Sequence, residues 1–223
     1  LFEIPVNKKY NNPLLYCFYD NGIIYYVDNK YQLYSYSINN SETKSIYNLK
    51  DEIKKRGKIT SILSFHGNIF ISFLTDGVIQ LIRQRNSLYT QSTINIKCGV
   101  FCLKKDLFQD ILWIGTDGQG VYLYFNASHS IQSVVLKQYF QQIQSPVRAL
   151  FIDKDRNLWI GTKGNGIVKL NNYEPGENIT ECNASFYTKE NSHLGNNAVY
   201  CFSKSAEDII WIGDEEGLDY YSY

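Results

Sequence analysis

The stretch that decides the fold is ILWIGTDGQGVYLYF, residues Ile111–Phe125, because the chain repeats its pattern. The clearest copies are LWIGTKGNGIVKL at Leu158–Leu170 and IWIGDEEGLDYY at Ile210–Tyr221. Weaker copies lie upstream, IFISFLTDGVIQL at Ile69–Leu81 and IYYVDNKYQLY at Ile24–Tyr34. A pattern that returns in this way indicates a repeat architecture, in which each copy belongs to one structural unit.

One aromatic residue is expected to anchor each copy, and the spacing of these anchors gives the period of the repeat. The anchors predicted from the copies are Tyr26, Phe70, Trp113, Trp159 and Trp211. They are separated by 44, 43, 46 and 52 residues. A period in the forties with short strands is typical of β-propeller blades. We interpret the three tryptophans as packing between blades rather than as platforms for a sugar.

Each copy has the pattern of a β-hairpin. Leu112–Thr116 is apolar and suits a buried strand, and Val121 begins the returning strand. Glycines between the two strands supply the positive φ angles that a tight turn needs. The glycines expected to do this are Gly118, Gly120, Gly164 and Gly166. Another short apolar run precedes each hairpin and a fourth strand follows it. The sequence therefore predicts an all-β propeller of four-stranded antiparallel blades.

The repeat divides the chain, residues 1–223, into about five blades. Their predicted ranges are 10–49, 50–96, 97–141, 142–189 and 190–223. Residues 1–8 alternate like a strand and are expected to be the outer strand of a neighbouring blade. Two assemblies are open at this point. The chain is either an arc of a larger propeller or a closed five-bladed ring in which residues 1–8 complete the last blade.

Composition restricts the class of partner. Lys plus Arg and Asp plus Glu both number 22, so the chain is formally neutral, whereas a nucleic-acid-binding protein normally has a basic face. The one basic cluster, Lys54–Arg56 with Lys58, is expected in a solvated loop. Three cysteines occupy equivalent positions in the first strands of three units and are expected to be buried small hydrophobic residues. They are Cys17, Cys102 and Cys201.

The sequence gives little support to catalysis. His66, His129 and His193 lie in different units, with no acidic partner at a metal-ligand spacing, and are expected in turns or on the surface. Acidic residues of the hairpins are explained by turn chemistry. We therefore predict no catalytic residue, no metal ligand and no cofactor. A five-bladed glycan-processing enzyme is kept as an alternative, since a carboxylate pair could lie among the 22 acidic residues.

Strand alternation places a candidate binding face at one edge of the blades. The hairpin between the second and third strands of a blade shares this edge with the linkers between blades. Polar loop tips on a rigid scaffold suit a hydroxyl-rich ligand. The candidate ligand-binding residues are Thr116, Asp117, Gln119, Arg148, Lys163, Asn165, Asp214 and Glu215.

The stretch LFIDKDRNLWIGTKGNGIVKL, Leu150–Leu170, resembles the two-component regulator propeller repeat, and Ile111–Phe125 resembles it nearly as well. The copy at Ile210–Tyr221 departs from it by losing the Thr and one Gly. The resemblance implies seven-bladed propellers in the periplasmic sensor region of hybrid histidine kinases, typically from gut Bacteroidetes, and it favours the arc. It also implies sensing of polysaccharide breakdown products, with the kinase and the membrane helix outside this chain.

Three functions follow as hypotheses. The first is a periplasmic sensor module that recognises an oligosaccharide or another small ligand and relays the signal through other domains of the full-length protein. The second is a non-catalytic propeller for protein interaction, for which a homodimer is one partner. The third is the glycan-processing enzyme.

Overall fold

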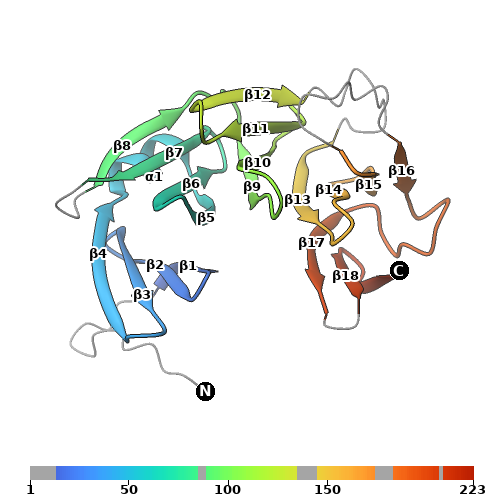
Figure 1. Ribbon diagram of the computed structural model, residues 1–223, viewed down its shortest axis with the longest axis horizontal. Coiled ribbons are helices and arrows are strands. Elements are labelled where there is room, and N and C mark those ends of the chain that lie inside the picture. Colours follow the sequence, from blue (N-terminus) through green and yellow to red (C-terminus); the bar gives the residue numbers. More distant parts are fainter. Residues whose placement is uncertain (1–13, 85–88, 135–144, 174–182, 206–207) are drawn as a thin grey trace. The chain divides into compact units, whose positions relative to one another are not determined.

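A computed structural model describes residues 14–84, 89–134, 145–173, 183–205 and 208–223. The chain separates into two compact units, Leu1–Lys97 (unit 1) and Cys98–Tyr223 (unit 2). Apart from one short helix, the described elements are antiparallel strands (Figure 1). The predicted strand over residues 1–8 lies outside the described residues.

Unit 1 contains two four-stranded sheets, and within each sheet the strands are paired in chain order. The first sheet is β1 (Leu14–Asp20), β2 (Ile23–Asp28), β3 (Gln32–Ser37) and β4 (Glu42–Asn48). Helix α1 (Lys50–Arg56) connects it to the second sheet. The second sheet is β5 (Ile59–Phe65), β6 (Asn68–Phe73), β7 (Val78–Arg83) and β8 (Tyr89–Ile94). Apolar side chains of the two sheets pack together as one core.

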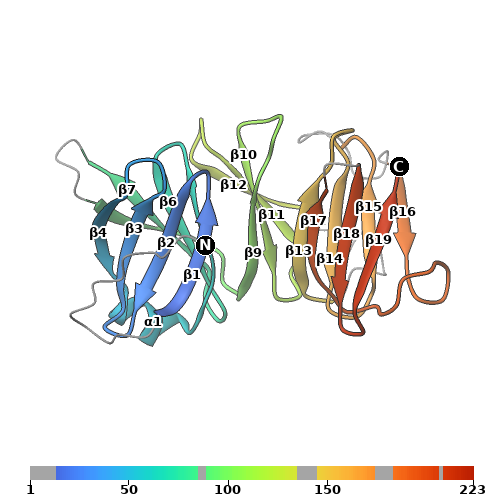
Figure 2. The same ribbon diagram turned by 90° about the horizontal axis from the view of Figure 1, so that it is seen from below.

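Unit 2 contains three sheets built on the same plan, with strands side by side in Figure 2. The first is β9 (Val100–Lys105), β10 (Ile111–Thr116), β11 (Val121–Phe125) and β12 (Ser130–Val134). The second is β13 (Val147–Ile152), β14 (Leu158–Thr162), β15 (Ile167–Leu170) and β16 (Ala184–Tyr187). The third is β17 (Val199–Lys204), β18 (Ile209–Asp214) and β19 (Leu218–Ser222). Every described sheet falls within one of the ranges expected from the repeat.

The strand register corrects one of the predicted anchors. Val27 pairs with Leu33 across a turn of the same length as the turn between Gly161 and Ile167. The residue equivalent to Trp159 is therefore Tyr25, which packs in the core of unit 1. The predicted anchor Tyr26 points to the other side of the sheet, because successive side chains of a strand alternate between faces. Because Tyr25 and Tyr26 are adjacent in β2, the sequence alone does not show which of the two tyrosines is the anchor.

Two of the anchors are fixed by a hydrogen bond from the indole ring to an aspartate of the preceding turn. Trp113 Nε1 donates to Asp106 and Trp159 Nε1 donates to Asp153, both at 2.8 Å. Both tryptophans are fully buried. Trp211 differs, because its indole is 36% exposed. The side chain of Trp211 lies on the face of the β17–β19 sheet that points away from the β13–β16 sheet, so packing between described blades is seen for Trp113 and Trp159, and for Trp211 it stays a prediction.

The hairpin glycines have different roles. Gly118 and Gly120 have φ of 75° and 76°, and Gly166 has φ of 70°, in the left-handed region where glycine is favoured. A Cβ at Gly166 would lie 2.2 Å from the carbonyl oxygen of Tyr187, so only glycine fits there. Gly164 is not among the residues with positive φ, so the prediction that it supplies the turn angle is wrong.

The basic cluster is not a solvated loop. Lys54–Arg56 forms the last turn of α1, where basic residues interact favourably with the helix dipole. The Arg56 side chain is buried and donates to Glu52 at 2.6 Å and to Asp76 at 2.7 Å. These two carboxylates compensate the buried charge and tie the helix to the β6–β7 turn.

The expectation of buried cysteines is wrong for two of the three. Cys17 and Cys201 are exposed, and Cys102 is half-buried. The Sγ atoms of Cys102 and Cys201 lie opposite Gly115 and Gly213, where a Cβ would approach within 2.5 and 2.6 Å. A small residue is needed there because the thiol occupies the space over the glycine. Burial raises the pKa of Cys102 to about 12, which makes it a poor nucleophile.

Candidate ligand-binding site

In unit 2, main-chain hydrogen bonds join each hairpin to the linker that enters the same sheet. Asp117 N donates to Gly99 O at 2.9 Å, Lys163 N to Pro146 O at 3.0 Å, and Glu215 N to Ala198 O at 3.1 Å. These bonds place hairpin and linker at one edge of each sheet, as strand alternation predicts.

Close packing brings the same edge of successive sheets together. A Cβ at Gly115 in β10 would lie 2.8 Å from Val147 in β13. In the same way, a Cβ at Gly161 in β14 would lie 2.8 Å from Val199 in β17. The three hairpins of unit 2 therefore line one shared edge, which we call the hairpin edge. All eight predicted ligand-binding residues belong to it.

Several of these residues hold the hairpins together. Thr116 is fully buried, donates from Oγ1 to Gly120 O at 2.7 Å and accepts from Gln119 N at 3.2 Å. The Gln119 amide oxygen accepts from the Tyr122 hydroxyl at 3.0 Å. Asn165 Oδ1 accepts from Ser145 N at 3.1 Å. The polar side chains of Thr116 and Asn165 thus satisfy the protein's own backbone.

Asp214 is also occupied by the backbone. Its carboxylate accepts from Glu216 N, Gly217 N and Asn196 N at 2.8, 2.7 and 2.9 Å. Partial burial opposes ionisation, but the main-chain donors outweigh it and lower the pKa of Asp214. A carboxyl group held ionised in this way is unsuited to act as the general acid of a glycosidase, which needs a raised pKa.

Asp117, Lys163 and Glu215 are exposed at the hairpin tips. Exposed charged tips carry little information about a ligand, because solvent satisfies them equally well. Their positions agree with the predicted face, but no described cavity gathers them.

Arg148 differs from the other seven residues. It is the extra residue of a β-bulge, since Val147 pairs with Thr162 and Ala149 with Gly161. Its guanidinium lies over the ring of Tyr200, with 4.6 Å between the guanidinium carbon and the ring centroid. The Nη1 atom is buried and has no hydrogen-bond partner among the described residues. A buried, unsatisfied N–H is costly, so this atom favours an oxygen acceptor from outside the chain.

The same bulge recurs at the start of every first strand. The bulged residues are Leu15, Thr60, Phe101, Arg148 and Tyr200. Bulges often redirect a side chain beside a functional site. In unit 2 they place Phe101, Arg148 and Tyr200 at equivalent points of neighbouring sheets. Sequence reasoning missed Phe101 and Tyr200, although both stand directly before the cysteine in VFCL and VYCF.

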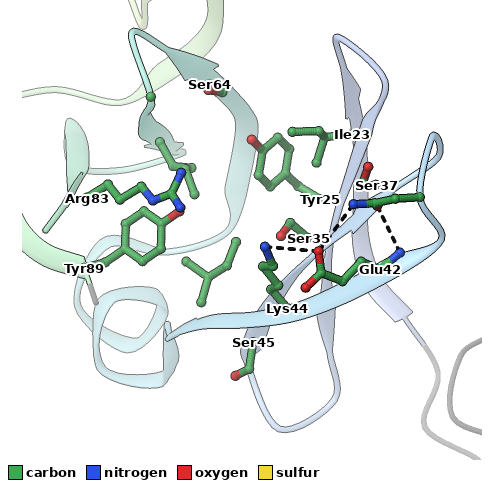
Figure 3. A pocket seen from close by; sticks show the side chains of 14 residues that line it. Ile23, Tyr25, Ser35, Ser37, Glu42, Lys44, Ser45, Ser64, Arg83 and Tyr89 are labelled. Carbon is green, nitrogen blue, oxygen red and sulfur yellow. Dashed lines mark hydrogen bonds and ion pairs between the residues drawn. The ribbon is translucent and has the colours of Figure 1, made fainter. Parts of the chain in front are cut away.

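A second feature lies in unit 1 and was not predicted from the sequence. A groove of about 580 Å³ opens between the first and second sheets (Figure 3). Its floor is apolar, with Tyr25 and Ile69 almost fully buried. Its walls carry hydroxyl and charged groups from both sheets, including Ser35, Lys44 and Arg83. We call this cavity the unit 1 groove.

With the geometry established, the chain can be compared with known proteins. The family model described as two component regulator propeller matches residues 141–164. This repeat is of the two-component regulator propeller type. The match covers β13 and β14 and includes Asp153 and Trp159, which have the structural roles described above. No curated protein sequence matches the chain.

Solved structures share the fold of this propeller chain at low sequence identity. The extracellular domain of BT4673 from B. thetaiotaomicron, assigned as a hybrid two component system, aligns with a TM-score of 0.67 and 18% identity over 97% of this chain. PorZ, a surface component of the type-IX secretion system of Porphyromonas gingivalis, aligns with a TM-score of 0.69 and 15% identity over 94% of this chain. YCF48 from Cyanidioschyzon merolae aligns with a TM-score of 0.64 and 12% identity over 97% of this chain.

The alignments cover only part of each larger protein. The chain spans 28% of the BT4673 chain, 32% of PorZ and 69% of YCF48. At these identities the likeness establishes the all-β fold of propeller blades and nothing about a ligand. Within the described part of the chain, no helix has the length and apolar character needed to cross a membrane.

Proposed function

We propose that the chain is part of an extracytoplasmic sensor module of a hybrid two-component signalling protein. The observation that carries this proposal is the two-component regulator propeller repeat at residues 141–164, together with the likeness to extracellular domains of such systems. In this role the propeller binds a ligand outside the cytoplasm and passes the signal to a kinase in another part of the protein.

The ligand class that we propose is an oligosaccharide derived from a polysaccharide, bound at the hairpin edge of unit 2. Arg148 offers a buried N–H without a partner among the described residues, and Tyr200 is 44% exposed beside it. A hydroxyl-rich sugar ring supplies oxygen acceptors for the Arg148 N–H and an apolar face that can pack on the Tyr200 ring. A rigid sheet holds both side chains, so little ordering is needed on binding.

Calorimetric titration of the full chain with a panel of neutral oligosaccharides tests this function. We expect saturable binding of at least one oligosaccharide. Arg148→Gln should weaken that binding about tenfold or more, since a hydrogen bond from a charged donor contributes about 1.5–3 kcal/mol. Lys54→Gln, which removes an exposed cation from helix α1 of unit 1, is the control. No binding across the panel, or equal binding by Arg148→Gln, would contradict the proposal.

The second candidate function is a homodimerisation propeller, and one surface favours it. The face of β17–β19 that points away from the β13–β16 sheet exposes Trp211, Leu218 and Tyr220 at 36, 66 and 64%. Trp211 and Tyr220 pair across the strands and their rings lie 5.9 Å apart. A second copy of the chain could cover this patch. Sedimentation should then give a dimer that Tyr220→Glu dissociates, and a monomer at all concentrations would exclude it.

A further inference from the structure

The unit 1 groove exists because one position of the repeat carries a small residue. Across the second and third strands, Tyr25 pairs with Ser35 as Trp159 pairs with Lys169 in unit 2. In unit 2 the Lys169 ammonium lies 5.1 Å from the Trp159 ring centroid and 5.4 Å from that of Tyr221. The lysine therefore occupies part of the space between two sheets, and the cavity that remains beside Trp159 is about 230 Å³. Ser35 is too short to do so, and the space in unit 1 stays open.

We propose that this groove is a binding site for a carboxylate-bearing sugar, such as a uronate unit of an oligosaccharide. The inference that the ligand is a sugar rests on the proposed sensor function. The inference that the ligand carries a negative charge rests on the residues of the groove alone. The hairpin edge of unit 2 has no part in this second site.

The size and floor of the groove suit a sugar ring. Its volume of about 580 Å³ lies within the usual range for small-molecule sites, roughly 300–1,000 Å³. Tyr25 on the floor is 3% exposed, and Ile69 beside it is 2% exposed. Ser35 and Ser64 add hydroxyl groups that can donate to or accept from the hydroxyls of a ligand.

The phenol of Tyr25 is fixed in a neutral form. Burial raises its pKa above the ordinary value, and its hydroxyl is hydrogen-bonded to Ser64. A neutral phenol does not repel an anionic ligand. The phenol itself therefore contributes apolar surface without negative charge, and the negative charge that acts on it is the Asp20 carboxylate beside Ser64.

The charges at the rim favour an anion. Figure 3 shows Arg83 and Tyr89 on one side of the groove and Glu42 and Lys44 on the other. Arg83 comes from β7, and no ion pair to its guanidinium is found among the described residues. Lys44 pairs with Glu42 at 3.1 Å, but both side chains are more than half exposed, and such a pair contributes little. Glu42 balances Lys44, and the Asp20 carboxylate is held by the Ser64 amide, which donates to it at 2.9 Å, so Arg83 is the cation that a ligand carboxylate can pair with.

Arginine is the cation best suited to this task. Its planar guanidinium can donate two parallel hydrogen bonds to one carboxylate, which gives direction as well as charge. Arg83 and Lys44 belong to different sheets of unit 1 and line the same cavity, so a bound carboxylate can contact both. A solvated surface cation would show no such convergence.

The test is a titration of the full chain with trigalacturonate and, separately, with the neutral galactose trimer, followed by amide NMR and by calorimetry. We expect trigalacturonate to shift the amide signals of Tyr25, Ser35 and Ser64, and to bind at least about tenfold more tightly than the neutral trimer. Arg83→Gln should weaken binding by about tenfold or more. Ser35→Lys, which copies the arrangement of unit 2, should abolish it by filling the groove.

The controls separate this proposal from the proposed function. Lys54→Gln removes an exposed cation of helix α1 that does not line the groove, and it should leave the trigalacturonate shifts of Tyr25, Ser35 and Ser64 unchanged. Thermal melting of Ser35→Lys and Arg83→Gln shows that each variant is folded. Equal binding of acid and neutral trimers, or no change in either groove variant, would overturn the groove site. The sensor function would instead fail if no saccharide shifted the signals of Arg148 and Tyr200.

Discussion

The space beside Tyr25 in unit 1 and the space beside Trp159 in unit 2 occupy the same place in the repeat but are filled differently. In unit 2, Tyr187 stacks on Trp159 with 5.8 Å between the ring centroids, and Lys169 covers it at 5.1 Å. In unit 1 a smaller anchor faces a groove of about 580 Å³. One register can therefore support a small cavity, about 230 Å³ beside Trp159, or the larger groove beside Tyr25, depending on a few side chains of the third and fourth strands.

Truncating the two anchors should show the largest difference between these regions. Trp159 is fully buried and lines a cavity of only about 230 Å³, so Trp159→Ala should cost about 3–5 kcal/mol of the free energy of unfolding. Tyr25→Ala opens onto the existing groove, so water can enter and the cost should be smaller. Urea denaturation of both variants measures the difference. Equal losses would mean that the groove is closed in solution.

Acid should destabilise unit 2 before unit 1. Asp153 accepts from Asn157 and from the Trp159 indole, and these bonds outweigh its burial and lower its pKa. A carboxylate with a lowered folded pKa contributes stability above its unfolded pKa of about 3.9, and loses it as the pH falls through the folded value. Tyr25 has no ring N–H to form the equivalent bond.

Hydrogen exchange followed by mass spectrometry between pH 6 and pH 3 measures this effect segment by segment. We expect β13–β16 to lose protection at a higher pH than β1–β4. Asp153→Asn should lower the stability of unit 2 by about 1–3 kcal/mol at neutral pH and remove most of its extra acid sensitivity. An unchanged pH profile in this variant would assign the acid response to another group.

Lys169→Ser should enlarge the cavity of about 230 Å³ beside Trp159 toward the size of the unit 1 groove. The variant loses two cation–π contacts and the packing of the lysine stem, for an expected cost of about 1 kcal/mol. Thermal melting measures the loss, and a crystal structure of the variant would show whether a groove forms. Lys163→Ser, at an exposed hairpin tip, is the matched control and should cost almost nothing.

The smallest effect is expected at the rim of the unit 1 groove. The Lys44–Glu42 pair is exposed, so Lys44→Gln should change the free energy of unfolding by less than about 0.5 kcal/mol. Denaturation in low and high salt measures this change. A larger loss would show that the pair stabilises the first sheet, which would weaken the case that Lys44 serves a ligand.

Much of the fold follows from the sequence because the same hairpin pattern occurs in several copies along the chain. The strand β10, for example, contains the apolar run Leu112–Thr116 that predicts a buried strand, and it ends where that run ends. Arg148 was reached by the same route, since strand alternation alone places it at the hairpin edge. Local pattern and global fold agree at these positions, so few alternatives compete.

The failures have a common physical cause. The anchor shift from Tyr26 to Tyr25 depends on pairing register, which two adjacent tyrosines leave ambiguous. The unit 1 groove depends on Ser35 being short opposite another sheet, and no local pattern reports on packing between sheets. Helix α1 was missed because its seven residues carry no long apolar stripe, and its buried Arg56 depends in part on Asp76, which lies 20 residues away.

The bond between aspartate and tryptophan has a consequence for the history of such chains. Asp106 and Trp113 are seven residues apart, and Asp153 and Trp159 are six apart, so each pair lies within a single sheet. A gene segment that encodes one sheet therefore also encodes both partners of this hydrogen bond when it is copied. Duplication or loss of a blade leaves the aspartate–tryptophan bonds of the other blades intact, and only the packing between neighbouring blades must change.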